Sequence, residues 1–231
     1  MRIVAMMVIA SWLACLADTA AAQSATDWAV GIWQGHVGAD PNKVGYGRIL
    51  RVEGVRSDGV AFGAWAVTGK GFTAAKIQAE AGKLTVITAA DSRVVLERKG
   101  DADLGGTMTL KSGVQLPAML RRVMVANFDG PWRGKAQPES NDCSAGEYRV
   151  TVKDGRIFGA VEFTSERRGK VYRSNVSGVV AADGKANLLL LPAPGETEAR
   201  SSRFAGTFAD ASFIGGDKGP NCSYEVRLSR R

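Results

Sequence analysis

The stretch Ile32-Trp33-Gln34-Gly35 returns later in the chain as Pro131-Trp132-Arg133-Gly134. Further matches follow in the same order: Asp58 to Gly63 with Asp154 to Gly159, Gly82-Lys83 with Gly184-Lys185, and Leu104 to Thr107 with Phe204 to Thr207. Matched positions lie about 100 residues apart, which is too long for a solenoid unit and typical of a duplicated domain. The sequence therefore predicts two domains of one fold, 23–125 and 126–231.

Alternating side chains predict strands with one packed face and one solvated face. Tyr148, Val150 and Val152 alternate with polar residues, and the pattern returns between residues 223 and 229. Short strands separated by Gly and Asp turns give each half seven or eight strands, about 10 residues apart. Local turns favour sequential hairpins. We expect an all-β fold of two tandem, up-and-down antiparallel barrels, with a sandwich as the alternative.

The N-terminal residues predict a signal peptide spanning 1–22. A cationic start precedes an apolar run over 3–17, and Ala20-Ala21-Ala22 before Gln23 is a small-residue cleavage pattern. The apolar run is shorter than the ~20 residues that cross a bilayer, and no later segment is apolar enough to span one. We expect a periplasmic or secreted protein. The alternative is a lipoprotein acylated at Cys15, because Leu13-Ala14-Cys15 resembles the end of a lipoprotein signal; Trp12 favours the cleaved peptide.

Two cysteines remain in the mature chain, Cys143 and Cys222, and both lie in the second half. Export to an oxidising compartment favours a disulfide between them. This bond would tie the beginning of the second domain to its end. A metal site is not expected, because two isolated cysteines without a nearby histidine cannot complete a tetrahedral ligand set.

The net charge of +7 is spread over both halves of the chain. Evenly distributed positive charge is typical of a solvated surface, with weak attraction to anionic envelopes as a secondary effect. Nucleic-acid binding would need basic residues interleaved with exposed aromatic residues. The pattern lacks this interleaving, so no specific nucleic-acid partner is expected.

Strand parity predicts which side chains point into each barrel. Trp33 and Trp132 take the inward parity of the opening strands, and Arg122 and Arg230 take the same parity at the ends of the closing strands. Three further inward positions are the ones we expect to face a ligand, if the barrels are hollow: Trp65, Val161 and Phe163.

These tryptophan and arginine positions resemble those of small lipocalin-like (calycin-type) barrels. In such barrels the closing-strand arginine stacks across the barrel end onto the tryptophan, which implies the pairs Trp33 with Arg122 and Trp132 with Arg230. Each half also resembles the Trp-x-Gly β domains found in tandem in uncharacterised exported proteins of Gram-negative bacteria. The resemblance implies a fold and no activity. A guanidinium over an indole face contributes ~1–2 kcal/mol when partly desolvated.

Candidates for catalysis are weak, and we expect no catalytic residue and no cofactor. His36 is the only histidine, and parity places it on the outer face of the first strand. The two cysteines are expected to be paired and lack a candidate base. Carboxylates are scattered, so no glycosidase-like pair stands out.

We therefore expect an exported, non-enzymatic binding protein. Its site would lie at a barrel mouth, at loops or in the groove between the domains, and its partner would be a small molecule, a glycan or an envelope protein. One alternative is an envelope-associated inhibitor or interaction module that acts through loops such as 138–144 or 192–200. The other is an unrecognised hydrolase.

Overall fold

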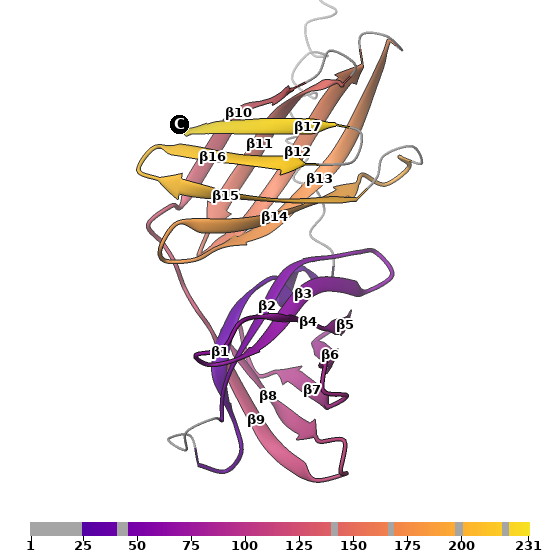
Figure 1. Cartoon of the computed structure of the whole chain (residues 1–231), viewed down its shortest axis with the longest axis vertical. Coiled ribbons are helices and arrows are strands. Elements are labelled where there is room, and N and C mark those ends of the chain that lie inside the picture. The colour runs from indigo at the N-terminus through magenta and orange to yellow at the C-terminus, as the bar shows by residue number, and fades with distance from the viewer. Residues whose placement is uncertain (1–24, 41–45, 140–142, 166–168, 197–200, 219–221) are drawn as a thin grey trace, which may run out of the picture.

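Figure 1 shows a computed structural model of the chain, which describes residues 25–40, 46–139, 143–165, 169–196, 201–218 and 222–231. The expected signal peptide and Cys15 lie outside the described residues. Within these ranges the only helix is one 3-10 turn, η1 (Asp27–Ala29), and none is long and apolar enough to cross a membrane. Two β-barrels follow one another along the chain and stack along the long axis of the molecule (Figure 1).

The first barrel is built from the first half of the chain. Its strands are β1 (Gly31–Val37), β2 (Gly47–Val55), β3 (Val60–Val67), β4 (Thr73–Ala74), β5 (Lys76–Glu80), β6 (Lys83–Ile87), β7 (Arg93–Arg98), β8 (Asp103–Thr109) and β9 (Gln115–Arg122). Neighbours in sequence pair antiparallel, and β9 pairs back with β1. Both β4 and β5 pair with β3 in one register, Trp65 opposite Thr73 and Ala61 opposite Ile77. They act as one interrupted strand, so the barrel has eight strands.

The second barrel has the same up-and-down order. Its strands are β10 (Gly130–Pro138), β11 (Ala145–Lys153), β12 (Arg156–Ser165), β13 (Lys170–Val180), β14 (Lys185–Pro192), β15 (Ser202–Ala209), β16 (Ser212–Lys218) and β17 (Ser223–Arg230). Strand β17 pairs with β10 and closes the ring. The predicted all-β fold of two tandem antiparallel barrels is confirmed, and the sandwich alternative is wrong because each sheet closes on itself.

The duplication extends to individual hydrogen bonds. The indole N–H of Trp33 donates to the Ala29 carbonyl at 2.9 Å, and that of Trp132 donates to the Phe128 carbonyl at 2.9 Å. One predicted match is wrong, however. Leu104 to Thr107 lie in the seventh strand of their barrel, whereas Phe204 to Thr207 lie in the sixth of theirs. Both segments have an apolar residue two positions before a Gly-Thr pair, so the sequence comparison matched two strands that occupy different positions in their barrels.

Each barrel is filled by its own apolar side chains. Trp33 is completely buried in the first core, and Trp132 is completely buried in the second. The segment that connects the two barrels, Val125 to Phe128, contributes to packing, because both of its end residues are buried in the second core. The connection between barrels is therefore anchored at the base of the second barrel, because the apolar side chains at both of its ends are removed from water.

Candidate functional site

The interiors of the barrels are occupied by protein, including the positions expected to face a ligand. Trp65 is 4% exposed within the first core, and Val161 is completely buried within the second. Phe163 is half-buried and packs at the edge of the second core, with its ring 6.4 Å from that of Tyr148 and 5.7 Å from that of Tyr224. All three side chains therefore contribute to packing.

The arginine of the first barrel closes one end of that barrel. The guanidinium of Arg122 lies 4.1 Å from the centre of the Trp33 ring and donates hydrogen bonds to the carbonyls of Val30 and Trp28. Burial, together with the nearby positive charge of Arg156, lowers the pKa of Arg122 to about 10. The group therefore keeps its charge at neutral pH and holds the 3-10 turn against the barrel.

The equivalent arginine of the second barrel is exposed. Arg230 lies 6.0 Å from the Trp132 ring, and it donates to the carbonyls of Asp129 and Asn127. The pairing expected from the resemblance is present at both barrel ends, but the two ends differ. A hollow of about 580 Å³ lies at this end of the second barrel, lined by Phe128, Phe208, Asp183, Asp210 and Arg230 among others.

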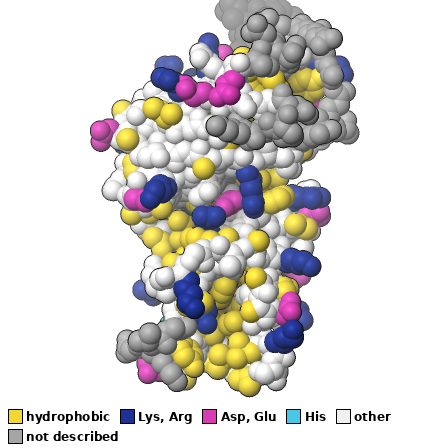
Figure 2. Space-filling model, in the orientation of Figure 1, with side chains coloured by type: hydrophobic (Ala, Val, Ile, Leu, Met, Phe, Trp, Pro, Cys, Tyr) yellow, Lys and Arg dark blue, Asp and Glu magenta, His cyan; other side chains and the backbone are white. Residues whose placement is uncertain are grey.

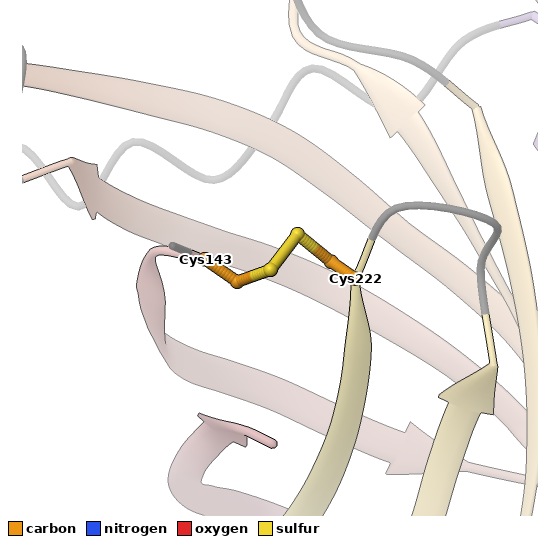
Figure 3. The surroundings of a disulfide bond; sticks show 2 residues. All are labelled: Cys143 and Cys222. Atoms are coloured by element: carbon orange, nitrogen blue, oxygen red, sulfur yellow. A yellow bond between two sulfur atoms is a disulfide. The ribbon is translucent and has the colours of Figure 1, made fainter. Parts of the chain in front are cut away.

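The disulfide lies at the opposite end of the second barrel. Cys143 precedes β11 and Cys222 precedes β17, and their sulfur atoms are bonded, as predicted (Figure 3). The bond spans 79 residues of sequence and joins the second strand of the barrel to its last. It is remote from the first barrel, so it constrains the second barrel alone.

The two barrels meet along β2 of the first and β13 and β14 of the second. Val179 of β13 is 1% exposed and packs with the core of the first barrel. Gly54 of β2 approaches the second barrel so closely that a Cβ at that position would lie 2.7 Å from a methyl carbon of Leu189. The hydroxyl of Ser177 donates to the Glu53 carbonyl at 3.0 Å. The barrels are therefore packed together along these strands.

A buried carboxylate lies in this interface. Glu53 is 3% exposed, and its oxygens lie 3.0 Å from Nε of Arg51 and 3.2 Å from Nε of Arg203 in β15. The register of β2 against β3 shifts between Val52 and Gly54. This bulge lets Val52 and Val55 both enter the first core, while Glu53 and Gly54 between them both face the second barrel. The carboxylate is thus shared by guanidinium groups of both barrels.

Beside this ion pair a groove of about 610 Å³ opens between the barrels. The first barrel contributes Ile32, Arg51 and Phe72, and the second contributes Val179, Ala181, Asp183, Lys185, Ala186, Asn187, Ala205, Gly206 and Thr207. Figure 2 shows basic, acidic and hydrophobic side chains close together where the two barrels meet. This volume is within the range of small-ligand sites, about 300–1,000 Å³.

The wall of the groove from the first barrel carries an exposed aromatic ring. Phe72, in the turn before β4, is 43% exposed, and the guanidinium of Arg51 lies 4.6 Å from its ring centre. Exposure of a large apolar side chain to water is unfavourable. Here Arg51 lies over the ring, and both side chains line the groove. The groove therefore presents a positioned aromatic surface to solvent.

The floor of the groove is formed by the second barrel, and it contains polar side chains without a side-chain hydrogen-bond partner among the described residues. Asn187 pairs across strands with Val179 on one side and Ala205 on the other, and Lys185 pairs with Thr207. Among the described residues, neither the Asn187 amide nor the Thr207 hydroxyl hydrogen-bonds another side chain. By contrast, Lys185 donates to Asp183 at 2.8 Å, and this hydrogen bond holds the pKa of the Asp183 carboxyl below its usual value.

Sequence reasoning missed Glu53, Phe72 and Asn187 as site residues. One signal was available: Leu188 to Leu191 is an uninterrupted apolar run, which is typical of a strand buried on both faces. Leu188 and Leu190 enter the second core, while Leu189, 1% exposed, packs against the first barrel. The run therefore marks the interface. Nothing in the sequence pattern marked Glu53.

His36 lies on the outer face of β1, opposite Gly47 of β2 and Met119 of β9, and it is half-buried. It is not part of the groove lining. In the described part of the chain, no three His, Cys, Asp or Glu side chains converge as metal ligands do.

No family model and no curated protein matches the chain. Among solved structures, it is similar to a protein of unknown function from the DUF3598 family of Nostoc punctiforme, at 12% identity and a TM-score of 0.29, covering 90% of this chain and 98% of that one. It is also similar to a mutant of transferrin binding protein B from Haemophilus parasuis, at 10% identity and a TM-score of 0.27. That match covers 87% of this chain and 45% of the other. The two-barrel fold rests on the strand pairing of this chain itself.

Proposed function

We propose that this is an exported, non-enzymatic binding protein whose ligand site is the groove between its two barrels. One observation carries the proposal: the barrel interiors are filled, whereas the groove combines an exposed ring, Phe72, with the unpaired polar groups of Asn187 and Thr207. Concave sites that mix apolar surface with a few convergent polar groups are typical of ligand binding.

Two features of the chain support export, one in its N-terminal residues and one in its second half. The residues 1–22 carry the pattern of a cleaved signal peptide, and the Cys143–Cys222 disulfide is of a kind that persists in oxidising compartments. The expected product is a mature chain that starts at Gln23. Intact mass of the exported protein tests this, because an acylated species that starts at Cys15 would contradict it.

A binding role is favoured over catalysis by the pairing of the acids near the groove. Glu53 is held between Arg51 and Arg203, and Asp183 is held by Lys185. A general acid or base at neutral pH needs a pKa near the working pH. The lowered pKa of Asp183 moves that carboxyl away from this range.

Amide chemical-shift mapping on the mature chain tests the position of the site. The probes are indole-3-acetamide, which is a neutral aromatic compound, chitohexaose and cellohexaose, and the expected shifts cluster at residues 72, 187 and 205–207. Ala205 is exposed on the groove floor, so Ala205→Trp should fill the groove and abolish these shifts. Val171→Trp on the outer face of β13, where Val171 is 51% exposed and does not line the groove, is the matched control and should preserve them.

The filled barrels also favour a second candidate, an interaction module or inhibitor that acts through loops. The two loops expected for this role, 138–144 and 192–200, lie partly outside the described residues. Shifts confined to residues 138–139, 143–144 and 192–196, unaffected by Ala205→Trp, would favour this candidate and contradict the groove. Hydrolysis of either oligosaccharide by the mature chain would contradict the non-enzymatic role.

A further inference from the structure

We propose that the ligand of the groove is a neutral sugar chain, an inference that rests on the groove being the binding site. The argument uses three features of the lining: its charges are internally paired, its exposed ring offers a flat apolar face, and its unpaired polar groups suit hydroxyl and amide partners.

The charged side chains of the lining already have partners. Arg51 has Glu53 at 3.0 Å, and Lys185 has Asp183 at 2.8 Å. An anionic ligand would compete with the buried Glu53 carboxylate for Arg51, and the exposed Asp183 carboxylate would repel it, which costs interaction energy. A neutral ligand meets no such cost. The arrangement therefore disfavours nucleotides and other polyanions.

Phe72 provides a surface for the apolar face of a ring. The guanidinium of Arg51 lies over its ring, at 4.6 Å from the centre, and 43% of the residue remains exposed. The cation restricts the motion of the aromatic ring, so a ligand that covers its free surface loses less entropy on binding. A pyranose carries axial C–H groups on one face and can cover such a ring, while its hydroxyl groups point sideways.

Asn187 and Thr207 are placed to bind those hydroxyl groups. An amide offers two donors and one acceptor, and a hydroxyl offers one donor and two acceptor lone pairs. Sugar hydroxyls both donate and accept, so they match both groups. The two side chains project from neighbouring strands β14 and β15, on successive cross-strand rows with Lys185 beside Thr207.

A purely apolar ligand fits less well. The side chains of Ile32, Val179 and Ala181 supply apolar surface, but burial of the Asn187 amide without a hydrogen-bond partner would cost free energy. A lipid or hydrophobic peptide would impose this cost on both polar groups. A carbohydrate removes the cost while it still covers Phe72.

Isothermal titration of the mature chain with chitohexaose, cellohexaose and maltohexaose tests this inference. At least one should bind with a Kd below about 1 mM, as expected of a shallow site with few hydrogen bonds. Phe72→Ala should weaken that binding about tenfold or more, because it removes the apolar surface that the C–H face of the sugar covers. Thr207→Val removes the hydroxyl at constant shape and should weaken it about threefold to tenfold.

Val114→Ala is the matched control. Val114 is 52% exposed in the turn between β8 and β9 and does not line the groove, so its loss should leave the affinity unchanged. Binding by none of the three hexasaccharides, or binding that Phe72→Ala leaves intact, would overturn the inference.

The non-sugar probe separates this inference from the proposed function. If indole-3-acetamide shifts residues 72, 187 and 207 while no hexasaccharide binds, the groove remains the proposed site and the assignment of a sugar ligand is wrong. If no probe shifts any of these residues, both the inference and the proposed site are wrong. Circular dichroism and unfolding midpoints of each variant establish that losses of affinity do not come from unfolding.

Discussion

The carboxylate of Glu53 in the first barrel lies 3.2 Å from the guanidinium of Arg203 in the second barrel. Glu53 is almost completely buried where the two barrels meet. Arg203 also lies over the ring of Phe62, at 5.2 Å from its centre. The ion pair and the stacking both join β15 to the outer face of the first barrel. Since removal of one partner from a buried pair leaves an uncompensated charge, this contact fixes how the barrels, and the groove beside them, are arranged.

We expect Glu53→Gln to reduce the free energy of unfolding by about 2 kcal/mol, below the cost of breaking a fully buried pair because Arg203 is half-exposed. Chemical denaturation measures the loss. The matched control is Glu97→Gln, which removes an exposed pair with Lys99 and should leave stability unchanged. Equal effects from the two substitutions would mean that Glu53 does not couple the barrels.

Trp132→Ala should destabilise the second barrel by about 3–5 kcal/mol, because the side chain is completely buried and contacts the ring of Phe208 at 4.8 Å. Lys135→Ala on the outer face of the same strand should have little effect. Thermal unfolding followed by near-UV circular dichroism distinguishes them. A large loss from Lys135→Ala would contradict the strand register.

Arg122→Met and Arg230→Met should have unequal effects, although the two arginines are equivalent by position. Loss of Arg122 leaves the buried or partly buried carbonyls of Val30 and Trp28 without their hydrogen-bond donor, which should lower the free energy of unfolding by about 2 kcal/mol. The exposed Arg230 should matter much less, because water can replace it. Urea denaturation of both variants provides the test, and a larger loss from Arg230→Met would contradict this account.

Cys222→Ser should destabilise the second barrel by about 2–5 kcal/mol and leave the first nearly unchanged, because the bond constrains the unfolded second half alone. Hydrogen exchange resolves the barrels separately. Peptide mapping without reductant should recover Cys143 and Cys222 in one linked fragment. Two free thiols, or loss of protection in the first barrel, would be the opposing result.

The sequence by itself determined the duplication, the number of strands, the disulfide and the inward tryptophans. These features follow from local alternation and from short repeated turns, and both are written in consecutive residues such as Tyr148, Val150 and Val152. Parity alone placed Arg122 and Arg230 on the inward side at the ends of the closing strands, and the resemblance to lipocalin-like barrels implied that they lie over the tryptophans, where the structure has them.

The tertiary structure alone decided that the barrels are filled, that Glu53 is buried and that a groove opens beside it. Ser177 and Glu53 bond across 124 residues of sequence, and no periodicity relates them. Alternation after the inward Val52 places Glu53 on the outer face, but no local pattern shows that the second barrel covers this face. Which outer faces meet depends on how two closed surfaces pack, and that is a property of the folded barrels rather than of any one strand.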